Sequence, residues 1–227
     1  MSRKANLDLI KFAKKTLGEL SEEVVFVGGI TACLYVDEKT AEPPRPTEDV
    51  DCVLEINHLN GYSDFEAKLR AKGFRNDTRP RAPICRYLYG ELLVLDVMPA
   101  DPEILGFGNK WYQLGIEHKV RFYLADGEIY IFPLDLFIAS KFEAYLGRGK
   151  SDPRMSSDLE DIVSVVDGCP QLVSTTADLN LKEYLKSMST EMLQDDRLVE
   201  AISGFLNNDQ DKIIKCQTRL QKFSSSF

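Results

Sequence analysis

The chain has 227 residues, of which 44% are hydrophobic and 28% are charged, a balance typical of globular proteins. Its formal net charge of −8 argues against a protein that coats nucleic acid through overall charge. No apolar run reaches the roughly 20 residues of a membrane span, and the charged N-terminal segment lacks a secretory cleavage site. Since the five cysteines are scattered and form no C-x-x-C pair, we expect a cytoplasmic protein with reduced thiols and no membrane partner.

Local patterns in the first quarter of the chain predict alternating helices and strands. These elements are a helix over residues 1–20, a strand over 24–27, a helix over 30–36, a proline-rich loop over 37–47 and a strand over 49–56. The pair Gly28-Gly29 separates the first strand from the second helix. In the second strand, Asp49 and Asp51 share one face, opposite Val50 and Cys52.

The middle of the chain predicts further strands, and its C-terminal part predicts helices alone. The expected elements are a helix over residues 62–72, a hairpin over 84–89 and 91–97 joined through Gly90, a hairpin or loop flap over 119–124 and 128–132, and helices over 134–146, 157–166 and 181–192 with two more after them. We therefore expect a mixed core over residues 1–132 and a helical C-terminal domain over residues 133–227.

Three acidic side chains in predicted strands are the main candidates for chemistry. Asp49 and Asp51 stand two residues apart on one strand, so both carboxylates project from the same face. Asp96 stands in the apolar run Leu-Val-Leu-Asp-Val-Met, where a carboxylate has no packing role. If the two strands are neighbours, three hard oxygen ligands converge, which suits Mg²⁺ or Mn²⁺ and phosphoryl transfer. The alternative is an acidic sheet face that is exposed to solvent.

The glycine pair Gly28-Gly29 can contribute to the same chemistry. A glycine turn between a strand and a helix lets backbone amides approach an anion closely at the positive end of the helix. Two adjacent glycines also occur in turns that bind nothing. The pair therefore has weight only in combination with the three acids.

The order of these features resembles the nucleotidyltransferase superfamily that includes DNA polymerase beta and the aminoglycoside nucleotidyltransferases. One branch, the AbiEii-like proteins, has toxins of toxin–antitoxin systems as its best-known members. Similarity to that branch is carried by Gly28-Gly29-Ile30-Thr31-Ala32, Arg45-Pro46-Thr47-Glu48-Asp49-Val50-Asp51, a helix lysine at Lys141, Arg148, and an Asp-x-x-Asp helix start at Asp158 and Asp161. The similarity covers about residues 24–166.

The resemblance implies an α+β fold, in which a nucleotidyltransferase-type mixed β-sheet core with helices is followed by an α-helical C-terminal part. It also implies transfer of a nucleoside monophosphate from an NTP to an acceptor hydroxyl, with Mg²⁺ or Mn²⁺ as cofactor. In this reading Asp49, Asp51 and Asp96 ligate the metal, and together with Lys141 they are catalytic. The implied nucleotide-binding residues are Gly28, Gly29, Thr47, Lys141, Asp158 and Asp161.

The resemblance also implies a specific role for each of the remaining charged residues. Asp96 would complete the metal site and take the proton of the acceptor hydroxyl, whereas Lys141 would neutralise charge on the triphosphate. Asp158 or Asp161 would orient Lys141 or contact the nucleotide. Alternatively, Lys141 and these two acids form a surface ion pair with no catalytic role.

The acceptor is open among several classes. The resemblance and the basic stretch from Lys68 to Arg86 favour tRNA, with a protein hydroxyl second, and the toxin branch implies a possible cognate antitoxin protein. The net charge is also compatible with a cationic small molecule of the aminoglycoside type. A third possibility is a binding module that keeps the nucleotide and has lost the chemistry.

Overall fold

The computed structural model describes residues 2–37, 44–56 and 59–226. The chain divides into two compact units, which are called here the first unit (Met1–Thr31 and Pro46–Pro133) and the second unit (Ala32–Arg45 and Leu134–Phe227). The sequence did not suggest that Ala32–Arg45 groups with the C-terminal helices. The expected domain boundary between residues 132 and 133 stays a prediction.

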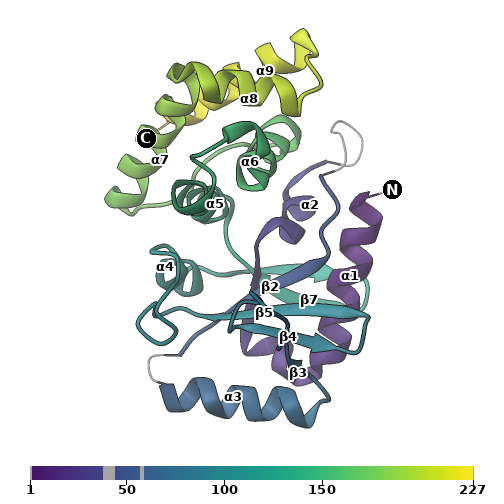
Figure 1. Ribbon diagram of the computed structural model, residues 1–227. Helices are drawn as coiled ribbons and strands as arrows, with labels where there is room; N and C mark the ends of the chain where they lie inside the picture. Colours follow the sequence, from purple (N-terminus) through teal and green to yellow (C-terminus); the bar gives the residue numbers. More distant parts are fainter. Residues whose placement is uncertain (1, 38–43, 57–58, 227) are drawn as a thin grey trace. The chain divides into compact units, whose positions relative to one another are not determined.

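The first unit is built on a mixed β-sheet (Figure 1). Its described strands follow the order β3-β4-β5-β2-β1-β7-β6. Their bounds are β1 Val24–Val27, β2 Asp49–Leu54, β3 Arg75–Asn76, β4 Arg86–Tyr89, β5 Leu93–Pro99, β6 Val120–Leu124 and β7 Gly127–Ile131. β2 pairs in parallel with β5 and antiparallel with β1, while β1 pairs in parallel with β7. The sheet therefore places the predicted acidic strands at its centre, side by side.

Helices cover this sheet because apolar residues recur along them at helical spacing. In α1 (Ser2–Leu17), the side chains of Ile10, Ala13 and Leu17 are fully buried, and the helix packs on β2 and β5. The other helical elements of the unit are η1 Gly18–Glu22, η2 Gly29–Thr31, α3 Leu59–Ala71 and α4 Tyr112–Glu117. Neither α4 nor β3 was predicted, because six and two residues are too short to show a periodic pattern.

The second unit is helical. Its described elements are α2 Ala32–Tyr35, α5 Leu134–Arg148, η3 Pro153–Met155, α6 Ser157–Gly168, α7 Leu179–Gln194, α8 Asp196–Phe205 and α9 Gln210–Ser225. Side-chain caps set several helix starts: Ser156 bonds to the amide of Leu159, and Asp178 to that of Leu181. The mixed sheet and these helices confirm the predicted α+β fold with an α-helical C-terminal part.

Three smaller expectations concern the connections, the thiols and the membrane. The helix predicted over residues 30–36 is split into η2 and α2, and residues 38–43 of the predicted loop lie outside the described residues. All five cysteines are buried free thiols. In the part of the chain that the structure describes, no helix is long and apolar enough to cross a membrane.

Candidate functional site

Strand register places the three candidate carboxylates on one face of the sheet. Asp51 on β2 is the parallel partner of Asp96 on β5. Side chains of paired residues point to the same side, and Asp49, two residues before Asp51, joins them. The side chain of Asp96 is 9% exposed and that of Asp49 is 39% exposed. This is the arrangement that the argument from sequence requires, with one acid buried and another open to solvent.

A guanidinium group joins two of these carboxylates. Arg86 on β4 is the antiparallel partner of Asp96, and its Nε and Nη2 donate to Oδ1 and Oδ2 of Asp96 at 2.8 and 2.7 Å. Nη2 also donates to Oδ2 of Asp49 at 3.0 Å. The hydrogen bonds to Asp96, followed by the charges of the nearby acids, raise the pKa of Arg86 above its ordinary value. In the sequence Arg86 stands in a basic stretch that was expected at the surface, and nothing in that pattern predicts this contact.

Gly28 lies directly against Asp51. Gly28 follows Val27, the antiparallel partner of Asp51, so the turn begins beside that carboxylate. The φ of Gly28 is 75°, and a Cβ at this position would lie 1.9 Å from Oδ2 of Asp51. Both the backbone conformation and the contact exclude a side chain. The predicted Gly28-Gly29 turn and the predicted acids are therefore adjacent in space.

Replacing Gly28 with alanine should destabilise the fold more than the backbone conformation alone explains. Gly106 offers a matched control, because its φ is 77° and a Cβ there would meet nothing within 4 Å. Gly106→Ala should cost about 1 kcal/mol, the ordinary penalty of a left-handed alanine. Gly28→Ala should cost at least about 1 kcal/mol more, because the Asp51 carboxylate must move. Urea unfolding gives the free energy of unfolding of both variants. An equal decrease in the two would contradict the close contact between Gly28 and Asp51.

Thr47 lies two residues before Asp49 and has a buried hydroxyl. Its backbone N–H donates to Oδ1 of Asn6 at 3.2 Å, which fixes the chain at the entry to β2. Its Oγ1 is buried and has no hydrogen-bond partner among the described residues. A buried hydroxyl without a partner costs free energy, so a ligand that accepts or donates there would be favoured. Thr47 was one of the predicted nucleotide-binding residues.

The carboxylates have the donor chemistry of a divalent-cation site. The described residues contain no group of three or more His, Cys, Asp or Glu side chains already arranged around a metal position. Instead, Asp49 and Asp96 converge on a cationic atom, Nη2 of Arg86. Carboxylate oxygens are the ligands that a hard divalent cation prefers. The residues fit Mg²⁺ or Mn²⁺ in chemistry, with Arg86 bound to two of the three candidate ligands.

The other candidate residues, Lys141, Asp158 and Asp161, belong to the second unit and bind one another. Nζ of Lys141 on α5 lies 3.1 Å from Oδ1 of Asp158 and 2.7 Å from Oδ2 of Asp161 on α6. The three side chains are 6% exposed or less. Lys141 and the two aspartates therefore do form ion pairs, but these are buried and not at the surface as the alternative predicted.

Two arginines bind the same buried acids from outside: the side chain of Arg45 is 27% exposed and that of Arg148 is 70% exposed. Arg45 forms two hydrogen bonds to Asp161, at 3.0 and 3.2 Å, and Arg148 forms two to Asp158, at 2.8 and 2.9 Å. Charges therefore alternate along the order Arg45, Asp161, Lys141, Asp158, Arg148. Arg45 and Arg148 stand in the motifs that suggested the family resemblance, and the structure gives each a carboxylate partner. The network joins α5, α6 and the segment that contains Arg45.

The network predicts a loss of stability in acid. Burial alone would raise the pKa of the Asp158 carboxyl, but the hydrogen bonds from Arg148 and the charge of Lys141 outweigh it, so its pKa is lowered. A lowered pKa means that the stabilisation is complete above the unfolded value of about 3.9 and is lost as the pH falls through the folded value. The urea concentration at the unfolding midpoint should therefore decrease when the pH is lowered below about 4. In Asp158→Asn this drop should be smaller, and an unchanged pH profile would contradict the assignment.

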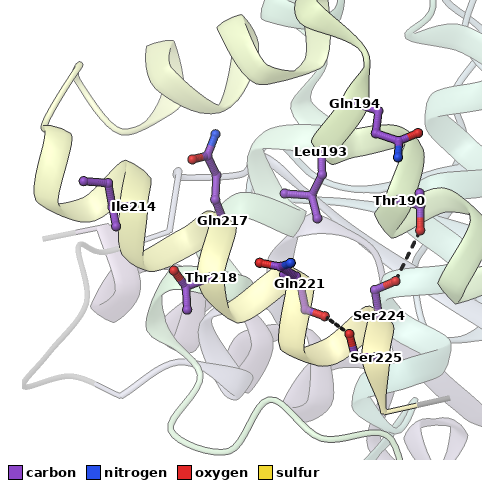
Figure 2. A pocket seen from close by; sticks show the side chains of 9 residues that line it. All are labelled: Thr190, Leu193, Gln194, Ile214, Gln217, Thr218, Gln221, Ser224 and Ser225. Carbon is purple, nitrogen blue, oxygen red and sulfur yellow. Dashed lines mark hydrogen bonds between the residues drawn. The ribbon is translucent and has the colours of Figure 1, made fainter.

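A cavity in the second unit lies between α7 and α9 (Figure 2). It has a volume of about 550 Å³ and is lined by Thr, Ser, Gln, Leu and Ile side chains. A hydrogen bond joins the hydroxyl groups of Thr190 and Ser224, which line the cavity (Figure 2), and the two oxygens lie 3.3 Å apart. None of the lining side chains is an acid, a base or a thiol, so this cavity lacks the groups that metal binding or proton transfer would need.

Comparisons with known proteins connect the fold to one class. No protein-family model and no curated protein matches the chain. Among solved structures, the chain is similar to an antigenic nucleotidyltransferase-like protein from Paracoccidioides brasiliensis, with a TM-score of 0.51 and 16% sequence identity. The match covers 96% of this chain and 94% of that one. At this identity the likeness concerns the fold, so the chain has a nucleotidyltransferase-like fold.

Proposed function

We propose that this protein is a metal-dependent nucleotidyltransferase that transfers a nucleoside monophosphate from an NTP to an acceptor hydroxyl. The observation that carries the proposal is the pairing of Asp51 with Asp96, beside the glycine turn at Gly28, in a nucleotidyltransferase-like fold. Acids on one face of adjacent strands repel one another unless a cation lies among them, and in this structure Arg86 lies between Asp49 and Asp96. A site that binds a cation and a polyphosphate gives these residues a common role.

The proposed roles are those that the family resemblance implies for these residues. Asp49, Asp51 and Asp96 would hold Mg²⁺ or Mn²⁺, which when bound neutralises phosphate charge. Asp96 would accept the proton of the acceptor hydroxyl while the oxygen of that hydroxyl forms a bond to the α-phosphorus. The bond from that phosphorus to the β-bridging oxygen breaks, and pyrophosphate leaves. The backbone of Gly28 and Gly29 would cradle the triphosphate.

Thr47 and Lys141 have different places in this proposal. The buried Oγ1 of Thr47 would gain a phosphate oxygen as its hydrogen-bond partner. Lys141 would neutralise the triphosphate only by exchanging a carboxylate partner for a phosphate, because Asp158 and Asp161 both hold its ammonium group. Asp158 or Asp161 would then orient Lys141 or contact the nucleotide itself.

The acceptor class that we propose first is tRNA, with a protein hydroxyl second, and we propose a role as an AbiEii-like toxin with a cognate antitoxin. The residue-level resemblance supports this choice. The charge argument for RNA is weaker than the sequence suggested, because several cations of the basic stretch are paired with acids. These pairs are Lys68 with Glu23, Arg70 with Glu66, Lys72 with Glu19, Arg79 with Asp77 and Arg86 with Asp96.

The test of this function is label transfer from each of the four α-³²P-labelled NTPs in the presence of Mg²⁺. Total RNA, a protein extract and a panel of aminoglycosides are offered in separate reactions. The proposal predicts label in one acceptor class and none when EDTA is present. Label in the aminoglycosides alone would replace the macromolecular acceptor by a small molecule. Mg²⁺-dependent NTP binding without label in any acceptor would indicate a non-catalytic module.

A further inference from the structure

Arg86 lies where a cation shared by Asp49 and Asp96 would lie. Its Nη2 is 3.0 Å from Oδ2 of Asp49 and 2.7 Å from Oδ2 of Asp96, so these oxygens are at most 3.0 + 2.7 = 5.7 Å apart. A Mg²⁺ ion with Mg–O distances of about 2.1 Å binds oxygens up to about 4.2 Å apart. The two oxygens would therefore need to approach by at most about 5.7 − 4.2 = 1.5 Å to share one metal ion, and the guanidinium and the metal would compete for the same oxygens.

We propose that Arg86 is a positioning residue that holds Asp49 and Asp96 as a built-in counter-cation and competes with divalent metal for their oxygens. The inference rests on the proposed metal site and goes beyond it, because the family resemblance assigned Arg86 no role. Arginine suits this task, since it stays charged at every working pH and its planar fork binds a carboxylate through two nitrogens. A lysine would offer one ammonium group and no such fork.

The contacts of Arg86 give an order to the exchange. Two hydrogen bonds hold Asp96, and the two residues are register partners, whereas a single bond of 3.0 Å holds the more exposed Asp49. When a metal ion binds, the hydrogen bond from Arg86 to Asp49 should therefore break before those to Asp96. Asp49 can then turn toward a cation at Asp51 while Arg86 keeps Asp96 in place.

The test is a titration of the nucleotide-free protein with Mn²⁺. Binding is measured by calorimetry and by the electron paramagnetic resonance signal of unbound Mn²⁺. Arg86→Gln should bind Mn²⁺ at least about tenfold more tightly than the wild type, because a unit charge a few ångströms from the metal is removed. Arg86→Lys keeps the charge and should show a smaller gain. Arg197→Gln, which breaks the pair between an exposed arginine at the start of α8 and the cap residue Asp195, should match the wild type.

Each outcome bears on the inference separately from the enzymatic proposal. Unchanged or weaker Mn²⁺ binding in Arg86→Gln, with the wild-type circular dichroism spectrum retained, overturns it. So does the absence of Mn²⁺ binding in every variant. If Arg86→Gln fails to fold, Arg86→Lys decides, and affinity equal to the wild type overturns the inference. Tighter binding in the variants without label transfer from any NTP would uphold the competition at Arg86 and reject the enzyme.

Discussion

Asp51→Asn should lower the rate of nucleotide transfer by about a thousandfold or more, because a metal-ligating carboxylate contributes several kcal/mol to the transition state. Asparagine has nearly the same shape, so it preserves the close packing against Gly28 and the pairing with Asp96. It removes the negative charge that the proposed cation needs. Label transfer from the NTP that the wild type uses is the measurement, made at saturating Mg²⁺.

The matched control for this change is Glu55→Gln. Glu55 follows β2 directly, is more than half exposed, and pairs with Lys119 at 3.7 Å. It is an acid at the end of the same strand with no place in the proposed site, so its variant should keep wild-type activity. If Asp51→Asn retained more than a tenth of the wild-type rate, Asp51 would not be a metal ligand. The thermal midpoints of both variants establish that the fold is intact.

Lys141→Met should destabilise the protein by about 3–5 kcal/mol, the usual consequence of leaving buried charges without their partner. The ammonium of Lys141 is the cation between two carboxylates that are almost fully buried, Asp158 and Asp161. Arg148 and Arg45 bind the same acids, but neither lies between them. Urea unfolding monitored by circular dichroism gives the free energy of unfolding.

Arg154→Met provides the comparison for Lys141→Met. Arg154 also contacts two carboxylates in the second unit, those of Asp152 and Glu200, at 3.2 and 3.4 Å, but all three side chains are exposed. Breaking such a pair should cost about 0–1 kcal/mol. A loss in Lys141→Met no larger than this would mean that Lys141 is available to a ligand and that the buried ion network is not a structural unit.

Strand positions in the first unit could be predicted because their pattern is local. The alternation in β2 placed Asp49 and Asp51 on one face, and the isolated position of Asp96 marked it as unusual before its neighbours were known. Whether β2 and β5 are neighbours is a matter of topology, and the sequence pattern alone could only suggest it. The structure places them as parallel neighbours with Asp51 opposite Asp96.

The role of Arg86 could not be predicted, because it depends on hairpin register. The sequence suggested a hairpin joined through Gly90 alone, whereas Tyr89 pairs with Leu93 and residues 90–92 form the connection. A change in loop length shifts the pairing, and with it the residue opposite Asp96. Only the observed loop brings Arg86 and Asp96 together.

The buried state of Lys141 depends on tertiary packing. A surface ion pair was one expectation, yet the helix around Lys141 is buried on several sides, including Ala139 and Phe142. A sequence signal for burial existed in the apolar run of α5, and the two aspartates of α6 were the available partners. That Arg45 joins them from a segment far away in sequence required the structure.

A crystal structure with Mn²⁺ and an NTP analogue that cannot release pyrophosphate would test the central claim most directly. The anomalous signal of Mn²⁺ locates the ion without assumptions about the surrounding side chains. We expect a peak in direct contact with carboxylate oxygens of Asp49 and Asp51, at about 2.1 Å as for Mg²⁺, with the triphosphate against Gly28. An ion and a nucleotide bound elsewhere, with Arg86 still bonded to Asp49 and Asp96, would contradict the account.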